Sequence, residues 1–144
     1  MKKIAIALLL SVSLFSTTSC KKELEPAILG RWEVIQLTEP DRTVYNLYGS
    51  SGHEENAWLK QITFSFYSWK GGRRENGAEA QRRLGVPAIQ HFDWTQATSA
   101  TYFLVDPVTR NFNTAVVEFM GQDRMVMTET NPVFRQYVFR FVGK

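Results

Sequence analysis

Short segments in which apolar and polar side chains alternate recur along most of this 144-residue chain. In residues 61–69 the apolar side chains Ile62, Phe64 and Phe66 alternate with polar ones. A period of two is typical of a β-strand with one buried face, because successive side chains of a strand point to opposite sides of the sheet. The same pattern recurs in residues 113–119 and 124–128. This recurrence predicts an all-β domain.

Turn residues divide the chain into about eight expected strands, at 31–37, 43–48, 61–69, 89–94, 101–105, 113–119, 124–128 and 135–142. The connections contain Gly, Pro, Asn and Asp, and most are too short for a crossover between parallel strands. Closure of such a meander removes both unpaired edges, so we predict an antiparallel up-and-down barrel of about eight strands. A sandwich of two sheets is the alternative that periodicity leaves open.

Two segments depart from simple alternation. Apolar residues at both parities in 31–37 predict a β-bulge or two covered faces. Residues 77–84, followed by Gly85 and Pro87, predict one short helix inserted between strands.

Two loops stand out by composition. Residues 70–83 carry five basic residues, Lys70, Arg73, Arg74, Arg82 and Arg83, which we expect on a solvated loop and helix near the barrel rim. Contact with anionic headgroups or an acidic partner is the alternative. The second loop holds Tyr45, Tyr48 and Trp58 near Gly49–Gly52, and is a candidate lid over a portal.

The first 19 residues differ from the rest of the chain. Lys2 and Lys3 precede an apolar run over 4–15 and a small polar stretch over 16–19, which predicts an export signal too short to span a membrane stably. The chain has 17 Lys and Arg and 14 Asp and Glu, so removing these two lysines leaves 15 minus 14, or +1. Such a weak charge gives no long-range attraction to nucleic acid, and we expect no nucleic-acid partner.

Cys20 is the only cysteine, so no internal disulfide can form. The stretch 17–20 (TTSC) resembles the lipobox of bacterial lipoproteins, although Thr17 replaces the usual leucine. The resemblance implies that Cys20 is acylated, by palmitate among other chains, and anchors the protein to a membrane. The alternative is a soluble exported protein with a free thiol.

The expected domains are a lipoprotein signal peptide at 1–19, a lipidated N-terminus and tether at 20–28, and a barrel at 29–144. Residues 21–28 reach at most about 28 Å from the anchor, at ~3.5 Å per residue. We expect the protein in the cell envelope, on the outer membrane, either periplasmic or surface-exposed.

Gly30 and Trp32 form a Gly-x-Trp start to the first expected strand, and Arg140 lies among aromatic residues in the last. These features resemble the lipocalins, especially small bacterial lipocalin-like lipoproteins, over roughly residues 29–142. The second lipocalin motif, Thr-Asp-Tyr, is absent. The resemblance implies a lipocalin-like barrel closed at one end by Gly30, Trp32 and Arg140, with the arginine packed across the tryptophan. Arg135 is the less favoured alternative for that contact.

The resemblance also implies that the barrel binds a small hydrophobic or amphipathic molecule. The candidate ligand-binding residues are the expected inward-facing ones: Ile62, Phe64, Phe66, Phe103, Phe119, Met125, Met127, Tyr137 and Phe139. The same side chains are enough to fill a small barrel, so the sequence is compatible with both a hollow interior and a filled one. Tyr137 and Gln90 are candidate polar groups for orienting a ligand.

Catalytic and metal-binding patterns are weak. His53 and His91 are the only histidines, and neither lies in a motif with zinc-ligand spacing. We therefore expect no catalytic residues, no metal and no cofactor, and no enzymatic activity. The leading interpretation is an anchored ligand-binding barrel. The alternative is a non-enzymatic interaction module with a solid core that docks on another envelope protein.

Overall fold

The computed structural model describes residues 27–131 and 133–144. The expected signal peptide, Cys20 and most of the tether lie outside these residues. The described chain forms nine strands, one α-helix and one 3-10 helix: β1 (Gly30–Thr38), β2 (Val44–Asn46), η1 (Ala57–Gln61), β3 (Ile62–Phe66), β4 (Gly71–Asn76), α1 (Ala78–Leu84), β5 (Ile89–Gln96), β6 (Thr101–Val105), β7 (Phe112–Phe119), β8 (Arg124–Asn131) and β9 (Arg135–Gly143). No helix in this part of the chain is long and apolar enough to cross a membrane.

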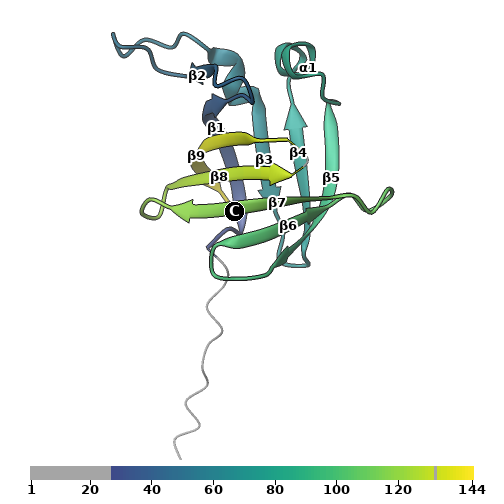
Figure 1. Cartoon of the computed structure of the whole chain (residues 1–144). Helices are drawn as coiled ribbons and strands as arrows, with labels where there is room; N and C mark the ends of the chain where they lie inside the picture. The colour runs from purple at the N-terminus through teal and green to yellow at the C-terminus, as the bar shows by residue number, and fades with distance from the viewer. Residues whose placement is uncertain (1–26, 132) are drawn as a thin grey trace, which may run out of the picture.

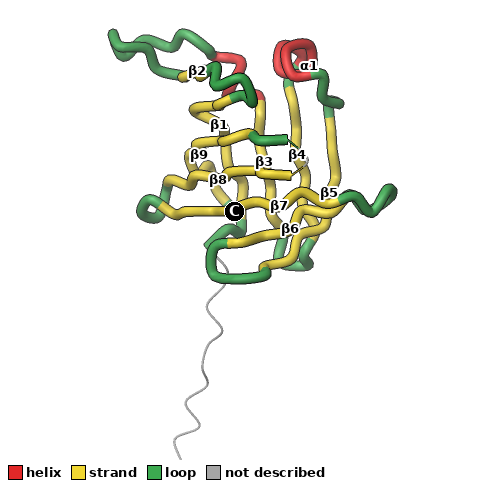
Figure 2. Tube along the Cα trace, in the orientation of Figure 1, coloured by secondary structure: helices red, strands yellow, loops and turns green. Residues whose placement is uncertain are grey.

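Eight of the strands form a closed barrel (Figures 1 and 2). The order is β1-β3-β4-β5-β6-β7-β8-β9, every neighbouring pair is antiparallel, and pairing of β1 with β9 closes the ring. Closure satisfies the backbone hydrogen bonds that an open sheet leaves unpaired at its edges. The predicted antiparallel up-and-down barrel is confirmed, and the two-sheet sandwich is excluded.

One of the strands predicted to form the barrel is wrong. The strand expected at 43–48 is only the three-residue β2, which pairs with β1 outside the barrel. Its place is taken by β4, which was not predicted as a strand. The inward positions of β4 are Gly72, Arg74 and Asn76, which are buried although none has an apolar side chain. The strand therefore lacks the alternation that identifies the others.

The bulge and the helix were predicted correctly. Val34 pairs with Phe139 and Gln36 with Val138, so Ile35 is the extra residue of a β-bulge. Both Val34 and Ile35 are consequently buried. Helix α1 ends at Leu84 and is capped by Gly85, which adopts the left-handed conformation with φ of 63°.

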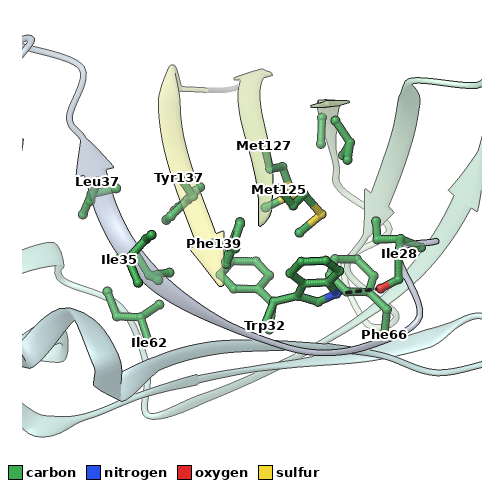
Figure 3. Packing of buried hydrophobic residues seen from close by; sticks show 14 of the residues in the cluster. Ile28, Trp32, Ile35, Leu37, Ile62, Phe66, Met125, Met127, Tyr137 and Phe139 are labelled. Atoms are coloured by element: carbon green, nitrogen blue, oxygen red, sulfur yellow. Dashed lines mark hydrogen bonds between the residues drawn. The ribbon is translucent and has the colours of Figure 1, made fainter. Parts of the chain in front are cut away.

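One end of the barrel, here named the closed end, is filled by aromatic and thioether side chains (Figure 3). Trp32 is 1% exposed, and its Nε1 donates a hydrogen bond of 2.9 Å to the Ile28 carbonyl oxygen. Its ring lies 5.0 Å from that of Phe141 and 6.2 Å from that of Phe119, between centroids. The chain therefore enters the barrel at the closed end.

The predicted contact of Arg140 with Trp32 is wrong. Arg140 lies on the outer face of β9, where its Nη2 donates a hydrogen bond of 2.8 Å to Glu33 Oε1. Trp32 faces inward, so the two side chains lie on opposite sides of the sheet. Arg135, the less favoured alternative, instead donates from Nε to Glu39 Oε2 at 3.0 Å. The ring that covers Trp32 belongs to Phe141, one residue after Arg140.

The resemblance implies that Gly30 lets the chain approach the Trp32 ring closely, but the ring beside Gly30 is that of Phe141. Its φ is +121°, and a Cβ there would lie 2.5 Å from Phe141 Cε2 and 2.8 Å from the Gly143 carbonyl oxygen. No side chain fits without moving the backbone of β9 or the ring against Trp32.

We expect Gly30→Ala to lower the free energy of unfolding by about 2–3 kcal/mol, because backbone strain and overpacking act together. Gly52→Ala is the matched control, since Gly52 has φ of +76° but no atom within 4 Å of a Cβ. Gly52→Ala should lower the free energy of unfolding by only about 1 kcal/mol, because it adds backbone strain without overpacking. Urea unfolding of both variants measures the difference, and equal losses would contradict the steric role of Gly30.

Candidate functional site

A cavity of about 300 Å³ lies inside the barrel toward the opposite, open end. Its walls are inward-facing side chains of strands β3 to β8, and its rim is the loop between β6 and β7. The lining residues are Phe64, Arg74, Gln90, Phe92, Leu104, Asp106, Thr109, Asn111, Asn113 and Glu129. Pockets for small molecules have volumes from about 300 Å³ upward. The interior is thus filled at the closed end and hollow at the open end.

Arg74 is the most unusual residue of the cavity. It projects inward from β4 and is only 6% exposed. Its Nε donates to Asn76 Oδ1 at 2.9 Å, and its Nη1 donates to the Tyr137 hydroxyl at 3.1 Å. Its guanidinium carbon lies 5.2 Å from the centre of the Phe64 ring. These contacts fix the guanidinium plane in the cavity wall.

One nitrogen of Arg74 has no partner. Nη2 is buried and forms no hydrogen bond to any described residue. Leaving a buried charged donor unpaired costs about 1–3 kcal/mol or more, so a native barrel keeps such a group only if something else satisfies it. The cavity offers space for that acceptor.

Glu129 lies on β8 in the same cavity and is 7% exposed. Burial raises the pKa of its carboxyl above the ordinary 4.5, and the positive charges of Arg74 and Arg135 oppose the rise. It forms no ion pair within 4.0 Å among the described residues. Burial also raises the pKa of Tyr137, so its hydroxyl keeps its proton while accepting the bond from Arg74.

The raised pKa of Glu129 has a consequence for stability. The folded protein holds this proton more tightly than the unfolded chain, so the free energy of unfolding falls as pH rises from about 4.5 through the folded pKa. Glu129→Gln keeps the shape of the protonated acid and cannot ionise. We expect it to raise the melting temperature at neutral pH and to leave it nearly unchanged well below 4.5.

Glu118→Gln is the control for this measurement, because Glu118 is exposed on the outer face of β7. It should show no such pH-dependent gain. Thermal unfolding followed by circular dichroism across pH measures both variants. A loss of stability in Glu129→Gln at neutral pH would contradict the unfavourable burial of the ionised carboxyl.

Eight of the nine predicted ligand-binding residues fall into three groups. Phe64 lines the cavity. Six others are buried in the core around and below it, namely Ile62, Phe66, Met125, Met127, Tyr137 and Phe139. Phe119 is half-buried against Trp32 at the closed end. Of the two predicted polar candidates, Gln90 lines the cavity and Tyr137 reaches it through Arg74.

The expectation that Phe103 faces the interior is wrong. Its neighbours Tyr102 and Leu104 are 2% and 6% exposed and face inward, so Phe103 faces outward. There it contacts Phe112 at 5.8 Å between ring centroids. Both parities of this strand are apolar, so the sequence pattern cannot tell its inner face from its outer one.

Arg74, Glu129, Phe92 and Leu104 were missed as cavity residues. Phe92 and Leu104 lie on predicted strands, and correct parity alone would have found them. Arg74 and Glu129 are charged, and charged residues are almost never buried unless paired. Nothing in a single sequence indicates that the side chains of these two residues face the barrel interior.

The five basic residues of 70–83 do not form one patch on the rim. Arg74 is inside the barrel, and Lys70 lies over the Trp94 ring at 4.1 Å. Arg73 pairs with Glu75, and Arg82 and Arg83 both pair with Glu79.

The candidate lid is also elsewhere. Tyr45 packs on Trp58 with centroids 5.3 Å apart, and neither residue lines the cavity. The rim is instead the 106–111 loop, which Asp106 orders by accepting hydrogen bonds of 2.8 Å from the backbone N–H groups of Val108 and Thr109.

The two histidines lie apart from the cavity. His53 is exposed in the loop after β2, and His91 is exposed on the outer face of β5. Within residues 27–131 and 133–144, no three His, Cys, Asp or Glu side chains are placed to hold a metal ion.

Comparison with known proteins supports the fold. No family model matches the chain, and no curated protein matches it. Among solved structures, a lipocalin-like protein from Bacteroides uniformis ATCC 8492 matches with a TM-score of 0.52 and 10% sequence identity, over 81% of this chain and 99% of that chain. At this identity the likeness concerns the fold alone. Together with the closed eight-stranded ring, it shows that the chain folds as a lipocalin-like barrel.

Proposed function

We propose that this protein is a membrane-anchored binding protein of the bacterial cell envelope, which holds a small amphipathic molecule in the open end of its barrel. The observation that carries the proposal is the buried, unpaired Nη2 of Arg74 beside a cavity of about 300 Å³. At roughly 30 Å³ per water-sized volume, the cavity has room for a ligand of about ten non-hydrogen atoms.

The polar and apolar walls indicate how such a ligand lies. An acidic group of the ligand accepts a charge-assisted hydrogen bond from Arg74, and its apolar part contacts Phe64, Phe92 and Leu104. The negative charge of a bound carboxylate would oppose ionisation of Glu129 in the same direction as its burial does. We therefore propose that an anionic ligand binds together with a proton. The hollow open end argues against the alternative of a solid barrel used only for docking.

Direct binding of two amphiphiles tests the ligand class. Octanoate and octylamine, which both fit the cavity, are titrated into the protein separately by isothermal titration calorimetry. We expect octanoate to bind about tenfold or more tightly, since a hydrogen bond between charged groups contributes about 1.5–3 kcal/mol. Preference for octylamine would contradict the anionic class, and no binding of either would contradict an amphiphile site.

The anchor is tested separately. We expect Cys20→Ser to leave the protein uncleaved or soluble, because the acyl chains that hold it in the membrane can no longer be attached. Fractionation of cell extracts measures the change. Membrane association equal to that of the wild type would contradict lipidation at Cys20.

A further inference from the structure

The closed end carries an exposed aromatic pair, Tyr67 and Trp69, in the turn between β3 and β4. The two rings are stacked, with centroids 5.3 Å apart and an interplanar angle of 13°. Trp69 is 70% exposed, whereas each of the other three tryptophans is at most 7% exposed. Trp69 is therefore the one tryptophan that the fold places in solvent.

The turn holds this pair in a fixed position. The Tyr67 N–H donates to the Gly71 carbonyl oxygen at 2.9 Å, and the Lys70 N–H donates to the Tyr67 carbonyl oxygen at 3.0 Å. The Trp69 ring lies directly on Gly71, where a Cβ would come within 1.7 Å of it. Trp69 is thus packed on backbone and on Tyr67 while one side of it stays exposed.

Further apolar and basic groups surround the pair. Tyr67 and Trp69 border a mainly apolar hollow of about 450 Å³, together with Leu29, Arg31 and Lys144 among others. We name Tyr67 and Trp69 the aromatic end. Its composition of aromatic rings with nearby cations is typical of protein surfaces at a membrane interface.

The position of the chain entry indicates which partner covers this surface. Leu29 and Gly30 line the hollow, and Ile28 accepts the hydrogen bond from Trp32, so the preceding residues join the barrel here. Those residues include the apolar run 4–15 and Cys20. The distance from Cys20 is at most about 28 Å along the chain.

We propose that the aromatic end is a lipid-facing surface, on which Tyr67 and Trp69 enter the headgroup region of the bilayer. The proposal uses the anchor proposed above only to bring the barrel to the membrane, and it does not depend on the ligand cavity. The barrel then stands on its closed end, and the rim at 106–111 faces away from the bilayer. A ligand enters the cavity from the aqueous side.

Quenching by brominated lipid tests this orientation. The full-length protein is reconstituted in vesicles of phosphatidylethanolamine and phosphatidylglycerol, with bromine on the acyl chains close to the headgroups. We expect brominated vesicles to quench about a quarter of the emission, the share of one tryptophan in four. Trp69→Phe should abolish the quenching.

A tryptophan at the other end is the matched control. Val108, in the rim loop, is 86% exposed. Trp69→Phe combined with Val108→Trp should restore an exposed tryptophan that brominated lipid does not quench. Quenching at position 108, or none in the wild type, would overturn the proposal.

Flotation of the vesicles separates this result from the other proposals. Protein that floats with the vesicles but is not quenched overturns the lipid-facing surface and leaves the anchor standing. Protein that does not float overturns the surface as well, because the aromatic end then has no affinity for lipid. Octanoate binding is measured in a separate experiment, which tests neither the anchor nor the lipid-facing surface.

Discussion

Trp32→Ala should lower the free energy of unfolding by about 3–5 kcal/mol, the largest stability effect expected for this chain. Trp32 is 1% exposed and contacts the rings of Phe119 and Phe141. Truncation removes these contacts and also the hydrogen bond to Ile28, which ties the chain entry to the barrel. Denaturant unfolding followed by fluorescence or circular dichroism measures the loss.

The control for this variant is Trp69→Ala. Trp69 is the same residue type at the same end of the barrel, but it is 70% exposed. We expect a loss of only about 0.5–1.5 kcal/mol in solution, the contribution of its stacked contact with Tyr67, because most of the ring is already in solvent. A near-neutral effect of Trp32→Ala, or equal losses in the two variants, would contradict the role of Trp32 in closing the barrel.

Arg74→Met should reduce the affinity for octanoate by about tenfold or more, the largest effect expected on binding. Methionine has a similar length but cannot donate a hydrogen bond to the carboxylate. Replacement of Arg74 also takes the hydrogen-bond donor from Asn76 Oδ1 and from the Tyr137 hydroxyl, so we expect some loss of stability beside the loss of binding. Binding is therefore measured at a temperature at which the variant is folded.

The control is Arg73→Met on the same strand. Arg73 forms an ion pair with Glu75, and its side chain is 37% exposed. Its replacement should leave octanoate affinity unchanged. Isothermal titration calorimetry with octanoate measures both variants, and thermal unfolding verifies that they are folded. Full octanoate affinity in Arg74→Met would contradict the assignment of Arg74 as the anion-binding group.

The fold was largely predictable because most strands bury one apolar face. The alternation in 61–69 and 113–119 and the short turns between strands led to the antiparallel closed barrel. Strand β4 was missed because it places glycines, Arg74 and Asn76 inside, and a polar inner face gives no apolar periodicity. The strand that carries the key cavity residue is therefore the one that alternation could not identify.

The site was less predictable than the fold because it depends on which face of each strand is inward. In 137–142 one face carries aromatic residues and the other carries Val138, Arg140 and Val142, so the arginine lies outside. The prediction that Phe103 faces inward was wrong for a related reason, because both faces of its strand are apolar. The pairing of Arg74 with Tyr137 joins positions 63 residues apart, which only the closed ring brings together.

The central claim is that the open end of the barrel binds an amphiphile through Arg74, and a crystal structure of the protein with octanoate tests it most directly. We expect the carboxylate within about 3 Å of Arg74 Nη2, and the alkyl chain against Phe64, Phe92 and Leu104. An empty cavity at saturating octanoate, or octanoate bound only on the outer surface of the barrel, would contradict the account.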